Sequence, residues 1–259
     1  MKSLLYISFL FSIALFSQER ITTEVVGTFP IKADQITHID NFGALFYTVG
    51  TTFYKKEDNQ NYSYSNVQLG AITSANAFNP LKINLFYKKF NTVLILDNRL
   101  SDIYRVNFSA IQPYKNITHI STGSDNTIWI FNQDTQHLEL FDYKTNKTRA
   151  TTMPVESEVL DLTSNYNYSW LLTEKFLYIY NYFGSTIAKI KNDGFIQIDE
   201  DNGNLIILKD QKLYFLSKKT SQLIPIHLPE LLIKQFLVTN ESLYIYSDET
   251  LHQFQLKFI

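Results

Sequence analysis

Strand-like runs alternate with polar turns along nearly the whole chain. In the clearest stretch, three such runs occupy residues 117–122, 127–131 and 137–142, and a more polar segment follows at residues 147–152. The runs are rich in Ile, Leu, Phe and other residues that favour strands, whereas the connectors carry Asn, Asp, Ser and Thr, which favour turns. We therefore expect a unit of four antiparallel strands joined by tight turns.

This unit recurs with a period of about forty residues, which is typical of β-propeller blades. We predict an all-β chain that forms a single β-propeller of about six four-stranded blades. Counts of five or seven stay open, because the first two repeats are irregular and can be divided differently. The first strand of each repeat starts near Ile36, Ala71, Ile117, Val159, Phe195 and Gln235.

The ends of the chain complement each other. The last repeat stops before a fourth strand, and a spare strand precedes the first repeat at residues 21–31. We expect this N-terminal strand to pair with the last blade and so to close the ring. Closure protects sheet edges, which otherwise act as templates for aggregation.

Asparagine is expected to replace glycine in the turns. The chain has 8 Gly, and Asn tolerates the left-handed backbone region better than most other residues. The Asn residues that we assign to such positions are Asn126, Asn132, Asn181, Asn192 and Asn240.

The first residues have the pattern of a secretory signal peptide. Lys2 gives a positive start, and residues 4–16 form an apolar run ahead of polar residues 17–20. A membrane-spanning helix needs about 20 apolar residues, so this run fits a signal-peptide core better than an anchor. We predict a signal peptide at residues 1–17 and a propeller domain at residues 18–259, with a retained anchor as the alternative. After cleavage we expect export without direct membrane insertion.

Charge and cysteine content exclude several classes of protein. The 259 residues include 23 Lys plus Arg and 25 Asp plus Glu, which gives a formal charge of −2. This balance provides no basic groove, so we expect no nucleic-acid partner. The absence of Cys excludes disulfides, thiolate zinc sites and cysteine nucleophiles.

Motifs that carry chemistry are sparse. The sequence has no glycine-rich phosphate loop and no Gly-x-Ser-x-Gly elbow, and its His residues are isolated. His38 and His119 occupy matching places in their repeats, which favours a lining position on the innermost strands over a metal site. Residues 121–129 are similar to the Asp-box of sialidases, but their Gly precedes their Asp. We therefore expect no catalytic residue, no metal and no cofactor, and a protein that is not an enzyme.

Four aspartates follow or interrupt apolar strands. We interpret them as acceptors of hydrogen bonds from turn amides, because a glycosidase needs two convergent carboxylates and no convergence can be derived from the spacing. They are Asp97, Asp142, Asp161 and Asp199.

Aromatic and amide residues between the strands are the candidates for binding a partner. Interfaces are enriched in Tyr, Trp and Arg, and loops on one rim of a repeat scaffold commonly bind. Packing between blades is the alternative use of these aromatic side chains. The candidates are Tyr62, Tyr64, Asn79, Pro80, Arg99, Tyr166, Tyr168, Tyr182 and Phe183.

Several segments resemble a family of exported bacterial β-propeller proteins, namely residues 79–99, 129–132, 138–142, 164–168 and 180–184. The family includes the Plug subunit of the type 9 secretion translocon, which occludes the periplasmic end of an outer-membrane pore. The resemblance covers nearly the whole chain after the predicted leader. It implies a periplasmic location, association with the outer membrane, and an outer-membrane translocon protein as partner. It supplies no catalytic residues.

Two functions follow from these observations. The leading hypothesis is a protein that docks on an outer-membrane protein-secretion pore and seals or gates its periplasmic opening. The alternative is a propeller of the cell envelope that binds a carbohydrate or another small ligand, with aromatic side chains beside the central channel.

Overall fold

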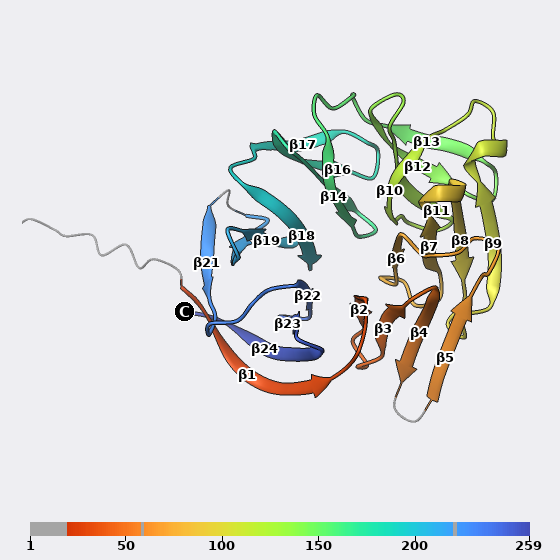
Figure 1. The fold of residues 1–259 in the computed structure, drawn as a ribbon. Coiled ribbons are helices and arrows are strands. Elements are labelled where there is room, and N and C mark those ends of the chain that lie inside the picture. Colours follow the sequence, from red (N-terminus) through yellow and green to blue (C-terminus); the bar gives the residue numbers. More distant parts are fainter. Residues whose placement is uncertain (1–19, 58–59, 220–221) are drawn as a thin grey trace, which may run out of the picture.

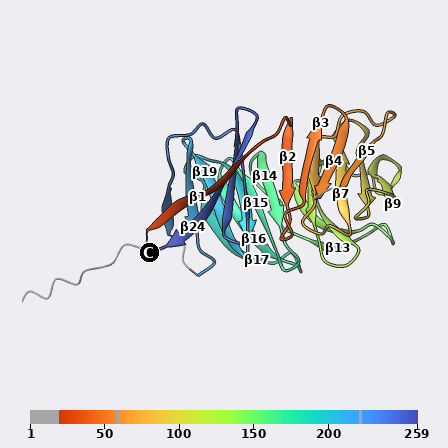
Figure 2. The ribbon, with the colours of Figure 1, turned by 90° about the horizontal axis from the view of Figure 1, so that it is seen from below.

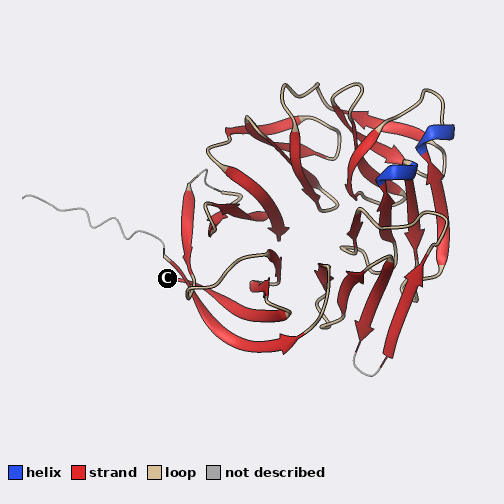
Figure 3. Cartoon of the chain, in the orientation of Figure 1, coloured by secondary structure: helices blue, strands red, loops and turns tan. Residues whose placement is uncertain are grey.

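The computed structural model describes residues 20–57, 60–219 and 222–259. Within these ranges the strands form sheets around a central axis (Figures 1 and 3), which confirms the prediction of an all-β chain. The helices of the described ranges, η1 (Lys88–Phe90) and η2 (Phe108–Ala110), are single 3-10 turns. The predicted signal peptide at residues 1–17 lies outside the described residues.

Four sheets contain four strands each, and each strand pairs with the next along the chain. In every such pair the strands are antiparallel, as expected for strands joined by short turns. Their strands are β2 (Gln35–Ile39), β3 (Leu45–Val49), β4 (Thr52–Glu57), β5 (Gln60–Ser65), β6 (Ser74–Asn76), β7 (Ile83–Tyr87), β8 (Thr92–Leu96), β9 (Asp102–Asn107), β10 (Ile117–Thr122), β11 (Thr127–Asn132), β12 (His137–Asp142), β13 (Lys147–Thr151), β14 (Val159–Ser164), β15 (Tyr168–Thr173), β16 (Phe176–Asn181) and β17 (Thr186–Lys191).

The remaining strands share one eight-stranded sheet, in the order β18-β19-β20-β21-β1-β24-β23-β22. Their bounds are β1 (Ile21–Pro30), β18 (Phe195–Asp201), β19 (Asn204–Lys209), β20 (Lys212–Leu216), β21 (Leu223–His227), β22 (Gln235–Thr239), β23 (Ser242–Ser247) and β24 (Thr250–Phe258).

Strand β1 closes the ring, as the sequence predicts. It pairs antiparallel with β24 from Ile21 to Pro30, so the N-terminal strand completes the last repeat. It also pairs in parallel with β21 through Ile21 and Thr22. This second contact joins two four-stranded halves into one sheet. The structure therefore has four separate four-stranded sheets and one eight-stranded sheet, and the prediction of about six four-stranded blades is confirmed only in part.

The first strands of the repeats form an inner ring around the axis. Each of β2, β6, β10, β14, β18 and β22 contacts the first strand of the neighbouring repeats. In four of them the register skips one residue near the start, which is a β-bulge. The residues that follow the skip are His38, His119, Asp161 and Gln197. His38 and His119 therefore do share one place in their repeats.

Apolar side chains fill the spaces between neighbouring sheets. One cluster joins β7–β9 to β10–β12 and contains the fully buried Phe86, Phe108 and Phe141. Another contains Ile21 of β1, which is 1% exposed. Each sheet thus buries both faces against its neighbours.

One predicted strand start is wrong. The second repeat begins at Ser74, not near Ala71, because a turn closed on Asn66 occupies the preceding connection. Gly70 at the end of that turn has φ +67°, a left-handed value that glycine adopts without strain. The strand β6 that follows is three residues long.

Candidate functional site

The two rims of the ring carry different loops. Because the strands of each repeat are antiparallel, the loops between its first and second strands lie at the same end as those between its third and fourth. We call this end the mouth rim. It carries the loops β2–β3, β6–β7, β14–β15 and their equivalents, and the opposite end is the back rim. Figure 2 shows the ring edge-on, with the strands running between the rims.

The structure places most of the sequence-predicted residues on the mouth rim. Asn79 and Pro80 lie in loop β6–β7, and Arg99 lies in turn β8–β9. Tyr166 and the strand end at Tyr168 belong to loop β14–β15. Tyr182 and Phe183 form turn β16–β17, with ring centroids 3.9 Å apart. Tyr62 and Tyr64 do not join them, because they lie along the outer strand β5.

The aromatic side chains of this rim reach solvent. Phe183 is 65% exposed and Tyr166 is 42% exposed. Phe42 in loop β2–β3, which is 90% exposed, is not among the sequence-predicted residues. A single Phe between Asn41 and Gly43 gives no periodic signal, so the sequence does not distinguish it from a core residue.

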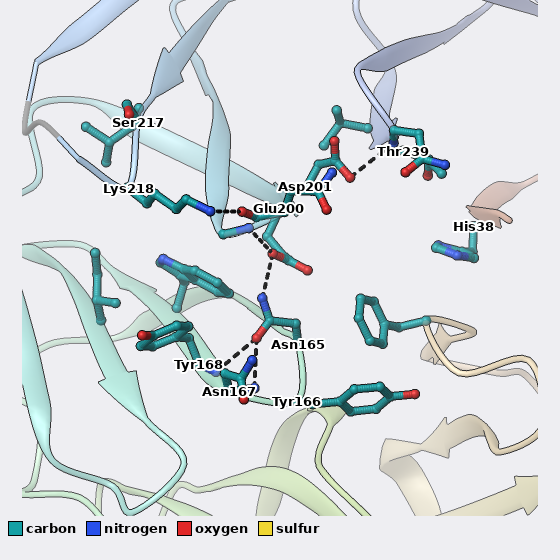
Figure 4. A pocket seen from close by; sticks show the side chains of 18 of the residues that line it. His38, Asn165, Tyr166, Asn167, Tyr168, Glu200, Asp201, Ser217, Lys218 and Thr239 are labelled. Atoms are coloured by element: carbon teal, nitrogen blue, oxygen red, sulfur yellow. Dashed lines mark hydrogen bonds between the residues drawn. The ribbon is translucent and has the colours of Figure 1, made fainter. Parts of the chain in front are cut away.

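A cavity of about 910 Å³ opens on the mouth rim, and we call it the hollow. It runs from the mouth of the central channel into the space between the β14–β17 sheet and β18–β21 (Figure 4). Of the sequence-predicted residues, Pro80, Tyr166 and Tyr168 line it. Other lining residues include His38, Phe42, Phe78, Asn165, Trp170, Ile187, Glu200, Asp201, Ser217, Lys218, Val238 and Thr239.

Two loops from non-adjacent sheets meet beside the hollow. The rings of Phe78 and Tyr166 contact edge to face, with centroids 5.1 Å apart and an interplanar angle of 85°. Phe78 comes from loop β6–β7 and Tyr166 from loop β14–β15, so the contact passes over the repeat of β10–β13. The pair gives the channel mouth an aromatic border.

Glu200 is the buried acid of the hollow. It is 8% exposed, and its Oε2 accepts hydrogen bonds from Asn165 Nδ2 at 2.9 Å and from the Gly203 N–H at 3.2 Å. Burial raises the pKa of Glu200 to about 7, and the nearby charge of Asp201 acts in the same direction. Near neutral pH this carboxyl therefore exists in both protonation states.

Two further carboxylates tie the inner strands together. Asp161 of β14 accepts the Ile198 N–H of β18 at 2.9 Å, and Asp199 of β18 accepts the Val238 N–H of β22 at 2.8 Å. Burial raises the pKa of Asp161 to about 6 and that of Asp199 well above its usual range. These two aspartates link neighbouring repeats, so their role is structural.

The histidines of the inner ring are neutral at physiological pH. Burial lowers the pKa of both His38 and His119 to about 4. Their rings pack beside Phe46 and Phe131 of the adjacent strands, with centroids 6.1 and 6.5 Å apart. Over the ranges that the structure describes, no group of three or more His, Cys, Asp or Glu side chains could hold a metal ion.

A membrane-spanning helix is likewise not found among the described residues: none of their helices has the length and apolar character to cross a bilayer.

No protein-family model matches the sequence, and no curated protein matches it either. Solved structures do match. A catalytically inactive variant of virginiamycin B lyase from Staphylococcus aureus, crystallised with quinupristin, is 12% identical with a TM-score of 0.62, over 88% of this chain and 82% of that one. The Pan2 WD40 domain of Neurospora crassa is 8% identical with a TM-score of 0.61, over 86% of this chain and 74% of the other.

PorZ is a third similar structure. It is described as an essential bacterial surface component of the type-IX secretion system of Porphyromonas gingivalis. The identity is 12%, the TM-score is 0.52, and the match covers 86% of this chain but 31% of PorZ. Likeness at such identities shows the fold alone, and the fold is a β-propeller.

The comparison with the lyase corrects one expectation. The scarcity of catalytic motifs in the sequence predicts a protein that is not an enzyme. That conclusion is wrong, because an enzyme shares this architecture over most of both chains. A propeller can build its active site from side chains of distant repeats, so short sequence motifs do not decide the question.

Proposed function

We propose that this chain is an exported periplasmic β-propeller that docks on an outer-membrane protein-secretion pore and seals or gates its periplasmic opening. The observation that carries the proposal is the gathering of exposed aromatic side chains on the mouth rim, namely Phe42, Tyr166, Tyr168, Tyr182 and Phe183. The loops of the back rim carry two such residues, Phe90 and Tyr114, in the described part of the chain. Exposed aromatic clusters are typical of protein-binding surfaces.

A closed ring suits this role. We propose that the two halves of the eight-stranded sheet act as two blades, so that the domain works as a six-bladed disc. Strand β1 links these halves and ties the two ends of the chain together. Such a body presents its rim loops from fixed positions, and less conformational entropy is lost on binding than with flexible loops.

The proposed location and partner rest on the sequence. The segments that resemble exported propellers, and the predicted leader at residues 1–17, support a periplasmic protein associated with the outer membrane. PorZ, a component of a type-IX secretion system, has the same kind of fold. This likeness supports the choice of a secretion pore as the partner to test first.

Site-specific crosslinking tests the proposal. A photo-crosslinking amino acid is placed at Phe42 on the mouth rim in one variant and at Val67 on the back rim in another; the native side chains are 90% and 93% exposed. We expect crosslinks in intact cells from position 42 to an outer-membrane secretion protein, and none from position 67. Equal crosslinking from both positions, or none to a membrane protein, contradicts the docking function.

A second candidate function is supported by the hollow. Its volume of about 910 Å³ lies within the range of small-ligand sites, about 300–1,000 Å³. A thermal-shift screen tests it, because a ligand present at about 100 times its dissociation constant stabilises a protein by about 2.7 kcal/mol. A screen of envelope sugars and small metabolites without any stabilising compound contradicts ligand binding and leaves the docking function untouched.

A further inference from the structure

One oxygen of Glu200 faces the hollow without a partner. Both hydrogen bonds of this carboxylate end on Oε2, and Oε1 has no hydrogen-bond partner among the described residues. The side chain is nevertheless 8% exposed and lines the cavity (Figure 4). Oε1 is not among the buried unpartnered atoms of the described residues, so a hydrogen-bond donor that enters the cavity can reach it.

The surroundings of Glu200 are acidic. Asp201 is the charge that acts on it, and it disfavours the ionised form. Within the described ranges no Lys, Arg or His forms an ion pair with Glu200. Two lysines also line the hollow, namely Lys218, whose Nζ donates to the backbone carbonyl of Asn202 at 3.0 Å, and Lys219. The acids of the lining, Asp40, Glu200 and Asp201, outnumber them, and this excess of negative charge favours a cation.

Two other polar residues that line the hollow, Asn165 and Thr239, already make hydrogen bonds within the fold. Asn165 Oδ1 accepts the N–H groups of Asn167 and Tyr168, and its Nδ2 donates to Glu200. The hydroxyl of Thr239 donates to the Ile39 carbonyl. A positively charged donor that enters the hollow can donate a hydrogen bond to Oε1 and is also attracted by the charge of the carboxylate.

Aromatic faces complete the surroundings. The Phe78–Tyr166 pair borders the hollow, and aromatic rings attract organic cations through their π-faces. We propose that the hollow binds a small organic cation, with its ammonium or amidinium group on Glu200 Oε1 and its apolar body against Phe78 and Tyr166. This inference rests on the second candidate function, ligand binding in the hollow.

Benzamidine and benzamide provide a matched pair of probes, because they are similar in shape and differ in charge. Calorimetric titrations of the full mature chain at about pH 8.5 and constant ionic strength measure both affinities. We expect benzamidine to bind at least about tenfold more tightly, as a charge-assisted hydrogen bond requires. In Glu200→Gln this preference should disappear. Glu241→Gln removes an exposed acid from loop β22–β23 outside the hollow, and it should keep the preference.

The outcomes separate this inference from the function on which it rests. Equal binding of both probes to the wild-type protein overturns the cation preference and keeps the hollow as a ligand site. If neither probe binds at millimolar concentration, the inference is overturned. The thermal-shift screen then tests separately whether the hollow binds any ligand. A preference that persists in Glu200→Gln overturns the role of Glu200. Tyr166→Ala, at an exposed position, should weaken benzamidine binding. An unchanged affinity in this variant would contradict a contribution of the aromatic border.

Discussion

Replacing Glu200 by Gln is expected to stabilise the fold, with an effect that grows as the pH rises. The usual pKa of a Glu is about 4.5, and burial raises that of Glu200 to about 7. The folded state therefore binds the proton more tightly than the unfolded chain. The stability that this provides is fully present below the unfolded pKa and is lost as the pH rises through the folded pKa.

The magnitude follows from the size of the shift. One pKa unit corresponds to about 1.36 kcal/mol, so the ionised carboxyl costs the fold about 3 kcal/mol at alkaline pH. Gln cannot ionise, and its amide oxygen can accept the same hydrogen bonds from Asn165 and Gly203. The difference in unfolding free energy between variant and wild type should grow by about 2 to 3 kcal/mol from about pH 5 to about pH 8.5.

Urea denaturation at these two pH values measures the difference. The shifts of His38 and His119 act in the opposite direction below pH 6.5, but they occur in both proteins and cancel in the comparison. Glu174→Gln makes the same chemical change at an exposed position and serves as the matched control. If the Glu200→Gln difference is also the same at both pH values, burial does not raise the pKa of Glu200, and the reasoning fails.

Three stability measurements test the rest of the fold by the same denaturation assay. Ile21→Ala removes a core residue of β1 that is 1% exposed, and it should lower the unfolding free energy by about 2 to 4 kcal/mol. Val25→Ala, at a position 60% exposed on the same strand, should change it by less than about 0.5 kcal/mol. Equal effects of the two changes would show that β1 is not packed against the core. Tyr246→Phe removes a hydroxyl that accepts a hydrogen bond at 3.1 Å from the buried Ala33 N–H in the β1–β2 connection. We expect the unfolding free energy to fall by about 1 to 3 kcal/mol, and an unchanged value would contradict that hydrogen bond. Lys115→Met leaves the buried carboxylate of Glu139 without its ion pair and should cost about 3 to 5 kcal/mol, much of it recovered by the added change Glu139→Gln.

The sequence predicts the repeat and its closure well, because both depend on local chemistry. Residues Ile117, Val159 and Phe195 begin strands as expected, since the contrast between apolar strands and polar turns is strong in those repeats. The parallel contact of β1 with β21 was not predictable, because it consists of two residue pairs, Ile21 with Ile226 and Thr22 with His227. A pairing this short leaves no pattern in the sequence.

Turn chemistry was predicted only in part. Asn240 has φ +49°, as expected for an Asn that replaces Gly. Asn181 and Asn192 stabilise their turns by another route, accepting backbone N–H groups with their side-chain oxygens. Asn132 lies within β11 and donates to Glu139 in a buried network. Composition identifies Asn as a turn residue, but it does not distinguish these three uses.

The hollow could not be predicted, because the ring brings its parts together. Loop β2–β3 and loop β14–β15 are more than a hundred residues apart in sequence, and no pattern relates Phe42 to Tyr166. The contact between Phe78 and Tyr166 joins sheets that are not neighbours. Loops are predictable one at a time from their turn residues, whereas a cavity depends on the curvature of the whole ring.

The aspartates and glutamates at strand ends and on the inner strands show why residue type alone does not identify a site. Asp97 and Asp142 accept the turn amides that the sequence predicts. Asp199 instead uses its two oxygens on the N–H groups of Glu200 and Val238. Glu200, the next residue, receives both of its hydrogen bonds on one oxygen. The two adjacent carboxylates therefore differ in the atoms left for a ligand, because both oxygens of Asp199 bind backbone N–H groups within the fold, whereas Oε1 of Glu200 has no partner among the described residues.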